Sequence, residues 1–359
     1  MAATALEDRV TEALRTELMK AKGMKEAEKV APKEKKVVAP LVKAKDTEDN
    51  SFEEVFGFKP TVNTKATVYK EDYWPSNIVD FIPSVDPDYI LPQEATSVLV
   101  YAIENGQFVN MVGPTGSGKS TLVEQVCAHL KRPFIRFNGR GDMETSSLLG
   151  QLVVEGGATI WKDGVFTEAV KVGATVLFDE YTATPPEINL SLQWLREHGG
   201  KLLLNDKPGD TKDRLTTPHP EFRLVCADNT RGLGDNGDQF AGTNIQNSAS
   251  LNRFDITIEH NYMEPKKEAG IITKKYPELS KGADYMVKLA TLVRNGYGKG
   301  EISVTLSPRN LLSWAKKAKD WGDMEQSFVF TYYNMLPSDS ERSAVQGFYK
   351  TVFDKALKV

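Results

Sequence analysis

The chain has 359 residues, enough for two or three domains and a sizeable hydrophobic core at roughly 100–200 residues per domain. Its longest apolar stretches, such as residues 174–178, fall far short of the roughly 20 residues that a membrane helix needs. Lys and Arg number 45 against 49 Asp and Glu, a net charge of −4. This composition argues against a membrane-spanning protein and disfavours a nucleic-acid partner.

The cysteines and the start of the chain bear on the compartment. Cys127 and Cys226 lie in apolar stretches and are too few for a disulfide framework or a multi-cysteine metal site. The first residues carry charges and contain no apolar segment of signal-peptide length. We therefore expect a cytoplasmic protein. The four histidines are scattered without the spacing of metal ligands: His129, His198, His219 and His260.

The first fifty residues differ in composition from the rest of the chain. They hold 11 Lys or Arg, 10 Asp or Glu and no aromatic residue, so they have little to bury in a core. A short helix is expected at residues 6–19, followed by an Ala-Pro-Lys tract at residues 30–45. We expect residues 1–50 to be a charged, disordered arm that either folds on a partner or acts as a solvated tether.

From residue 51 on, strand-like and helix-like segments alternate. Helices are expected between the strands, for example at residues 120–130 and 186–198. This alternation predicts an α/β fold in which helices cover both faces of a parallel sheet. The β-rich runs lie at residues 108–112, 133–137, 174–178, 222–226 and 255–258.

After about residue 263 the strand signals stop and helical patterns remain. They predict a small all-helical domain at residues 264–359, after an N-terminal extension and α/β domain at residues 51–263. The expected helices span residues 283–293, 309–319, 324–334 and 341–356.

A complete phosphate-binding motif lies between the first strand and the helix that follows it. In such a loop, backbone N–H groups surround phosphate oxygens at a helix N-terminus. Lys119 can reach the β- and γ-phosphates, and Ser120 can offer its hydroxyl to Mg²⁺. We therefore expect ATP and Mg²⁺ as ligands. The candidate phosphate-binding residues are Gly113, Pro114, Thr115, Gly116, Ser117, Gly118, Lys119, Ser120 and Thr121.

An acidic pair, Asp179 and Glu180, follows the apolar strand at residues 174–178. Next to a phosphate loop, one carboxylate can hold Mg²⁺ and the next can activate a water molecule. We assign Asp179 to the metal and Glu180 to the general base. The alternative is a pair that merely marks the end of a strand.

Three further residues are candidates for the same chemistry. Asn229 follows the strand at residues 222–226, where it can orient the attacking water or simply stabilise a turn. Arg253 precedes the last strand and can point toward a neighbouring subunit's γ-phosphate, or form a surface salt bridge. Arg309 opens a helix of the C-terminal region, either as a second cationic contact to phosphate or as a charge near the helix cap.

Taken together, these elements resemble an AAA+ ATPase. Residues 307–309 (Ser-Pro-Arg) and 252–255 (Asn-Arg-Phe-Asp) are similar to the sensor 2 and arginine-finger motifs of the MoxR-like branch. That branch includes the CobS-type small subunit of aerobic cobaltochelatase. The CobS likeness covers roughly residues 75–330 and is specific in the stretch from the acidic pair to Arg309. It is closest in residues 85–89, 222–235 and 242–254.

The resemblance implies a P-loop AAA+ domain followed by a small helical lid. It also implies a homo-oligomeric ring, usually a hexamer, in which Arg253 completes the neighbour's site. A hairpin insert is implied before the acidic strand, which suits residues 150–164, and a second candidate hairpin begins at residue 201. The implied partner is a protein client or a von Willebrand A-domain protein of the CobT kind. No sequence signature for cobalt or a tetrapyrrole accompanies the resemblance.

Three functions remain open from the sequence. The first is an ATP-driven motor that remodels a protein partner. The second is a nucleic-acid motor that uses the hairpin at residue 201, and the third is a nucleotide-sensing scaffold without useful turnover. The basic residues of that hairpin region alternate with aspartates, which disfavours the second function: Lys201, Lys207, Lys212 and Arg214 against Asp206, Asp210 and Asp213.

Overall fold

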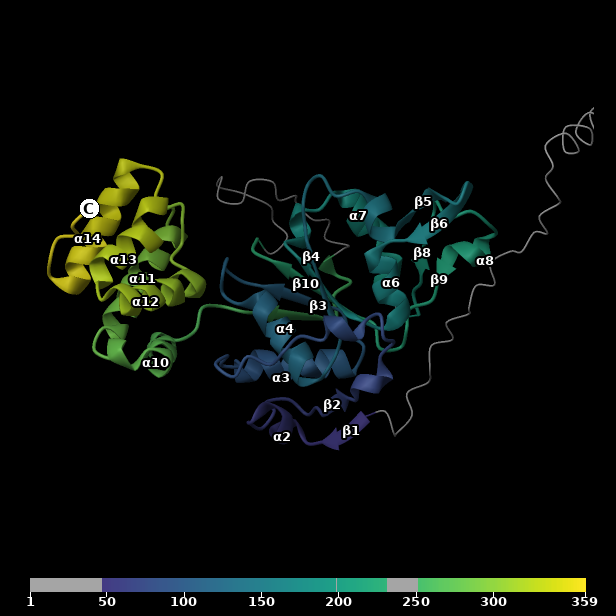
Figure 1. Cartoon of the computed structure of the whole chain (residues 1–359), viewed down its shortest axis with the longest axis horizontal. Coiled ribbons are helices and arrows are strands. Elements are labelled where there is room, and N and C mark those ends of the chain that lie inside the picture. Colours follow the sequence, from purple (N-terminus) through teal and green to yellow (C-terminus); the bar gives the residue numbers. More distant parts are fainter. Residues whose placement is uncertain (1–46, 198, 231–250) are drawn as a thin grey trace, which may run out of the picture. The chain divides into compact units, whose positions relative to one another are not determined.

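The computed structural model describes residues 47–197, 199–230 and 251–359 (Figure 1). The helix expected at residues 6–19 and most of the motif at residues 242–254 lie outside these residues. Strand β1 (Thr47–Asn50) belongs to the segment expected to be a disordered arm, yet it pairs antiparallel with β2 (Ala66–Tyr69). Regular structure therefore begins at least four residues before the expected boundary, because β2 supplies the backbone partners that the arm's sequence does not reveal.

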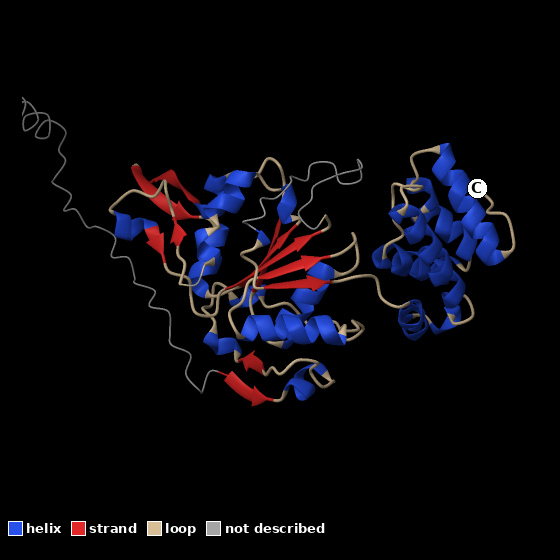
Figure 2. Cartoon of the chain, turned by 180° about the vertical axis from the view of Figure 1, so that it is seen from behind, coloured by secondary structure: helices blue, strands red, loops and turns tan. Residues whose placement is uncertain are grey.

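Five parallel strands form the central sheet in the order β11-β3-β10-β7-β4. Figure 2 shows strands in red and helices in blue. Each strand of the sheet begins and ends within two residues of a run predicted from the sequence, so the predicted parallel sheet is confirmed. Since β3 lies between β10 and β11, segments more than a hundred residues apart in the chain become neighbours. The strands are β3 (Val109–Val112), β4 (Phe134–Asn138), β7 (Thr175–Asp179), β10 (Arg223–Asp228) and β11 (Ile256–Glu259).

Helices cover both faces of this sheet. Successive residues of a strand point to opposite faces. On β7, Val176 and Phe178 pack into a cluster that includes Phe166 of α6 (Val165–Val172). Leu177 instead joins a cluster with α3 (Gln93–Glu104) and α4 (Lys119–His129), to which Leu122 belongs. Burial on both faces explains why these strands read as continuous apolar runs.

The helix expected at residues 186–198 is shorter than predicted. The α-helical part, α7 (Pro186–Ser191), ends after six residues, and a 3₁₀ turn follows at Trp194–Arg196. Leu195 and Arg196 are both buried in this turn, and Arg196 donates to the Cys226 sulfur at 3.7 Å. The segment thus continues from α7 as a short 3₁₀ turn, a form that is frequent next to the ends of α-helices.

The α/β region also contains two antiparallel hairpins, as the sequence predicts. The first pairs β5 (Gly150–Glu155) with β6 (Ala158–Asp163). Its turn residues Gly156 and Gly157 both have positive φ, at 60° and 80°, as a two-residue hairpin turn requires. The second pairs β8 (Leu202–Leu203) with β9 (Leu215–Thr216), and α8 (Thr211–Arg214) lies in the connection.

The C-terminal region is helical throughout, as predicted, and has its own core. The rings of Trp314 and Phe328 pack in that core at a tilted angle of 53°, with centroids 4.8 Å apart. No helix among the described residues is long and apolar enough to cross a bilayer. The helices are α10 (Pro265–Lys275), α11 (Ala283–Gly298), α12 (Pro308–Trp321), α13 (Met324–Thr331) and α14 (Asp339–Phe353).

Candidate nucleotide-binding site

The phosphate loop connects β3 to α4 and requires glycine at two tight contacts. Gly113 has φ 155°, and a Cβ there would lie 2.1 Å from the carbonyl oxygen of His260. Gly116 has φ 71°, and its Cβ would lie 2.5 Å from the Cβ of Ser307. These positions exclude larger residues for both conformational and steric reasons. The loop is therefore packed against two segments of the chain: His260, which follows β11, and Ser307, which precedes α12.

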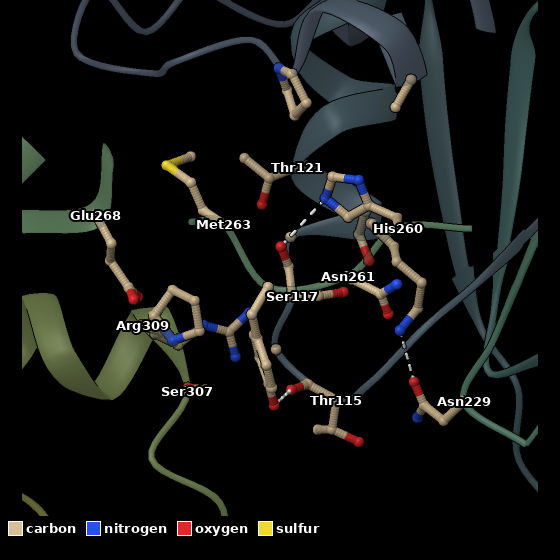
Figure 3. Close-up of a pocket in the computed structure, with 18 of the residues that line it drawn as sticks. Thr115, Ser117, Thr121, Asn229, His260, Asn261, Met263, Glu268, Ser307 and Arg309 are labelled. Carbon is tan, nitrogen blue, oxygen red and sulfur yellow. Dashed lines mark hydrogen bonds between the residues drawn. The ribbon is translucent and has the colours of Figure 1, made fainter. Parts of the chain in front are cut away.

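A pocket of about 1680 Å³ lies over this loop (Figure 3). Most of the residues predicted from the sequence line it, although they come from four separate segments of the chain. Gly113, Pro114 and Arg253 do not line it within the described part of the chain. The predicted residues that do are Thr115, Gly116, Ser117, Gly118, Lys119, Ser120, Thr121, Asp179, Glu180, Asn229 and Arg309.

Lys119, the first residue of α4, is only 6% exposed. Its amine donates to the carbonyl oxygens of Gly113 at 2.7 Å and Pro114 at 3.0 Å. It also donates to Oδ1 of Asn229 at 2.7 Å, the dashed line that ends at Asn229 in Figure 3. Burial lowers the pKa of Lys119 to about 8, although the charges of Asp179, Asp228 and Glu180 act in the opposite direction. The ammonium thus sits in a site where phosphate charge would stabilise it.

Oxygen ligands suited to Mg²⁺ lie at the end of β7. The hydroxyl of Ser120 donates to Oδ2 of Asp179 at 2.5 Å, and that carboxylate is nearly buried. Mg²⁺ prefers hard oxygen ligands and is commonly held by one or two carboxylates together with substrate phosphates. The Ser120–Asp179 pair fits that requirement. Arg136 of β4 also reaches Oδ2 of Asp179, with its Nη2 at 2.5 Å.

Glu180 has an unusual backbone for a non-glycine residue. Its φ of 52° and ψ of 42° lie in the left-handed region, which costs free energy for an L-residue. Gly139 packs against this point, since a Cβ there would lie 2.2 Å from the Glu180 carbonyl oxygen. The side chain of Glu180 is exposed and lines the pocket. The turn thereby directs adjacent carboxylates differently: Asp179 is nearly buried and Glu180 is solvent-accessible.

The two arginines occupy different places. Arg309 lies in the first turn of α12, after the N-cap residue Ser307, whose hydroxyl accepts from the N–H of Asn310 at 3.3 Å. It faces the pocket (Figure 3). Arg253 instead has its Nε and Nη2 3.4 Å from Oε1 of Glu197, on the chain that follows α7. Within its own chain it is therefore a salt-bridge residue outside the pocket.

Four residues at or beside the site were not predicted. Asp228 is 1% exposed and accepts from the Thr182 hydroxyl at 2.8 Å, one residue before Asn229. His260 lies with Nε2 3.1 Å from the carbonyl oxygen of Ser117. The remaining two are Arg136 and Tyr262. Only Asp228 and His260 had a local signal, since each lies at the end of a predicted strand on the same edge as the phosphate loop.

The sheet order, the loop between β3 and α4 and the acidic pair at the end of β7 define a P-loop nucleotide-binding protein. A family model described as AAA domain (dynein-related subfamily) matches residues 109–242. The aerobic cobaltochelatase subunit CobS of Sinorhizobium sp. is 32% identical over 317 residues, covering 86% of this chain and 91% of CobS. The chain belongs to the AAA+ ATPases, in the MoxR-like branch that includes CobS.

The comparisons found further similarities. The gas vesicle ATPase GvpN of Haloferax mediterranei is 30% identical over 272 residues, covering 69% of this chain and 73% of GvpN. Among solved structures, the RuvB Holliday junction branch migration motor of Thermotoga maritima matches 73% of this chain and 75% of that chain, with TM-score 0.43 and 16% identity. The family predicted from the motifs is confirmed, and its members use ATP and Mg²⁺ in general.

Proposed function

We propose that this chain binds ATP with Mg²⁺ and hydrolyses its terminal phosphoanhydride within a homo-oligomeric ring, and that turnover remodels a protein partner. One observation carries the catalytic part of the proposal. Lys119, Asn229, Asp179 and Glu180 converge on one pocket although they come from helix α4 and from the ends of two strands, β10 and β7. Such convergence provides a cation, a metal ligand, a water-orienting amide and a base.

Each residue has a role that its position supports. The backbone of residues 113–118 and the Lys119 ammonium bind the phosphates, and Lys119 exchanges its present carbonyl acceptors for phosphate oxygens. Ser120 and Asp179 would hold Mg²⁺, which neutralises charge on the β- and γ-phosphates. Arg309 adds a cationic contact from the lid side. These interactions position the γ-phosphate beside Glu180.

The chemical step is an attack by water on the γ-phosphorus. Glu180 accepts a proton from the water as the oxygen–phosphorus bond forms, and the bond from the γ-phosphorus to the β–γ bridging oxygen breaks. The products are ADP and inorganic phosphate, and the proton is then released to solvent. Asn229 orients the water through its side-chain amide. We assign Arg253 to the γ-phosphate of the adjacent subunit, because it lies outside the pocket of its own chain.

The proposal of a protein partner has support from the hairpin β5–β6. Leu152, Val154 and Ile160 on this hairpin are 49%, 79% and 38% exposed. Leu152 and Val154 share one face of the hairpin, and Ile160, opposite Val153, lies on the other face. Exposed apolar side chains favour contact with a protein rather than with a polyanion. A protein client or a von Willebrand A-domain partner, as the CobS resemblance implies, is the class we propose. Whether corrin metallation is involved depends on that partner.

Glu180→Gln tests the proposal directly. The variant keeps the shape of the side chain but cannot accept the proton, so we expect unchanged ATP affinity and turnover reduced roughly 100-fold or more. Turnover is measured by phosphate release and affinity by titration with a fluorescent nucleotide. Glu187→Gln on α7 is the matched control, because Glu187 is exposed and does not line the pocket. Equal, slow hydrolysis by wild type and Glu180→Gln would instead indicate a nucleotide-sensing scaffold.

The same variant tests the partner. Bound ATP should persist on Glu180→Gln, so a client should be retained in the presence of ATP and not by Lys119→Ala, which loses phosphate binding. Stimulation of wild-type ATPase activity by single-stranded DNA, lost on charge reversal of Lys207, Lys212 and Arg214, would favour a nucleic-acid motor over this proposal.

A further inference from the structure

Tyr262 lies in the link between β11 and α10 and contacts the phosphate loop. Its hydroxyl donates to the carbonyl oxygen of Thr115 at 2.8 Å. The same hydroxyl lies 3.3 Å from the hydroxyl of Thr305, on the segment that leads into α12. One side chain therefore reaches both the loop that binds phosphate and the approach to the helix that carries Arg309.

A buried ion pair holds the ring of Tyr262 in place. The guanidinium of Arg294, on α11, lies 4.4 Å from the ring centroid, close enough for a cation–π interaction. Arg294 also binds Glu268 of α10 through two hydrogen bonds of 2.7 and 2.8 Å, and both side chains are less than 10% exposed. A bidentate pair of this kind is geometrically specific. The position of the ring is thus set by α10 and α11 together.

The same guanidinium holds the start of α12. Nε of Arg294 donates to the carbonyl oxygen of Leu306 at 2.8 Å, one residue before the N-cap Ser307. Ser307 in turn packs against the phosphate loop, since a Cβ on Gly116 would lie 2.5 Å from its Cβ. The loop and the helix start therefore touch directly and are also linked through Tyr262 and Arg294.

We propose that Tyr262 is a positioning residue that couples the conformation of the phosphate loop to the placement of Arg309 at the start of α12. The inference rests on the proposed function, because it takes Arg309 as a phosphate contact. When phosphate binds, a shift of the Thr115 carbonyl would also shift the Tyr262 ring. Through Arg294 and Thr305, that shift would move the backbone before Ser307 as well. Burial raises the pKa of Tyr262, so its hydroxyl stays protonated and available as a donor.

Tyr262→Phe tests the coupling, because it keeps the ring beneath Arg294 and removes only the hydroxyl. We expect a loss in affinity for fluorescent ADP with Mg²⁺ of about 2- to 10-fold, the range for one net hydrogen bond. The decisive measurement is a double-mutant cycle with Arg309→Ala. Since Tyr262 acts through Arg309, Tyr262→Phe should cause little further loss in the Arg309→Ala background. A merely structural role would give the same fold loss in both backgrounds.

The control is Tyr285→Phe on α11, whose side chain is 46% exposed and outside the pocket. It should leave nucleotide affinity unchanged. Three outcomes would each overturn the coupling without bearing on the proposal of ATP hydrolysis. They are wild-type affinity in Tyr262→Phe, wild-type affinity in Arg309→Ala, and fold losses that multiply in the double variant. Equal turnover by wild type and Glu180→Gln would instead refute the proposed function, so the two failures are distinguishable.

Discussion

Lys119 illustrates how one residue's environment prepares it for a ligand. The side chain is nearly buried, and three oxygen atoms accept from its amine. Desolvation nevertheless lowers its pKa to about 8. Phosphate oxygens would favour the charged form, so the pKa of Lys119 should rise when nucleotide binds. Nucleotide binding and proton binding at this residue are therefore linked.

This linkage predicts that nucleotide affinity falls as pH rises through about 8. Below that pH the amine is charged in the free protein, and above it binding must take up a proton, so Kd should rise by up to about tenfold per pH unit. Calorimetric titration with ADP in buffers of different ionisation enthalpy measures both Kd and the proton uptake. The stability of the unliganded protein has the opposite dependence, since the folded pKa lies below the unfolded one and this residue's contribution improves above pH 8.

Lys119→Met provides the control for the pH dependence. Its weaker residual binding should show no proton uptake in the alkaline range. An alkaline rise in Kd of the same slope in Lys119→Met would assign the effect to another group. The phosphate-binding role of Lys119 is predicted by the sequence motif alone. Its lowered pKa depends on burial by residues from distant segments, which the sequence does not reveal.

At the scale of elements, β7 and β5 differ in how their leucines are covered. Leu177 on β7 is fully buried between the sheet and α4, whereas Leu152 on β5 is 49% exposed. Leu177→Ala should therefore lower the free energy of unfolding by about 2–5 kcal/mol. Leu152→Ala should change it by less than about 0.5 kcal/mol. Urea denaturation followed by circular dichroism compares the two, and similar losses would contradict the described burial.

The same contrast explains which elements were predictable. Strands buried on both faces read as uninterrupted apolar runs, so β3, β7 and β10 were located within two residues. The Gly156-Gly157 pair likewise marks its hairpin, because few other residues adopt positive φ at both turn positions. The segment 186–198 has a helix-like apolar pattern as well, yet tertiary burial of Leu195 and Arg196 overrides it. Local pattern predicts such an element but not where it ends.

At the scale of the whole molecule, Arg253 has no place in the pocket of its own chain and pairs with Glu197. If it serves a neighbouring subunit, Arg253→Ala should bind nucleotide normally but lose turnover, by roughly 10³-fold for an arginine finger. Mixing Arg253→Ala with Lys119→Ala should restore part of the ATPase activity, because each variant supplies what the other lacks at a shared site.

A second mixture serves as the control for complementation. Lys119→Ala and Glu180→Gln both damage a subunit's own pocket, so their mixture should show no comparable rescue. Absence of rescue at any ratio of Arg253→Ala to Lys119→Ala would contradict a site shared between chains. The salt bridge to Glu197 would then be the principal role of Arg253.

The sequence by itself determined the phosphate loop, the acidic pair, the strand that leads to Asn229 and the family, because these depend on residue types at short, fixed spacings. The α/β order and the helical C-terminal region follow from apolar periodicity, which is also local. The boundary expected at residue 50 could not be derived in this way, since β1 is recognisable only through its pairing with β2.

Only the tertiary structure decided which of the candidate residues meet. Arg136 reaches Asp179 because β4 lies beside β7, and Tyr262 reaches Thr115 because β11 lies beside β3. It also separated the two arginines, with Arg309 at the pocket and Arg253 outside it. The physical reason is that sheet order and side-chain burial arise from contacts between distant segments, and residue spacing along the chain carries no record of them.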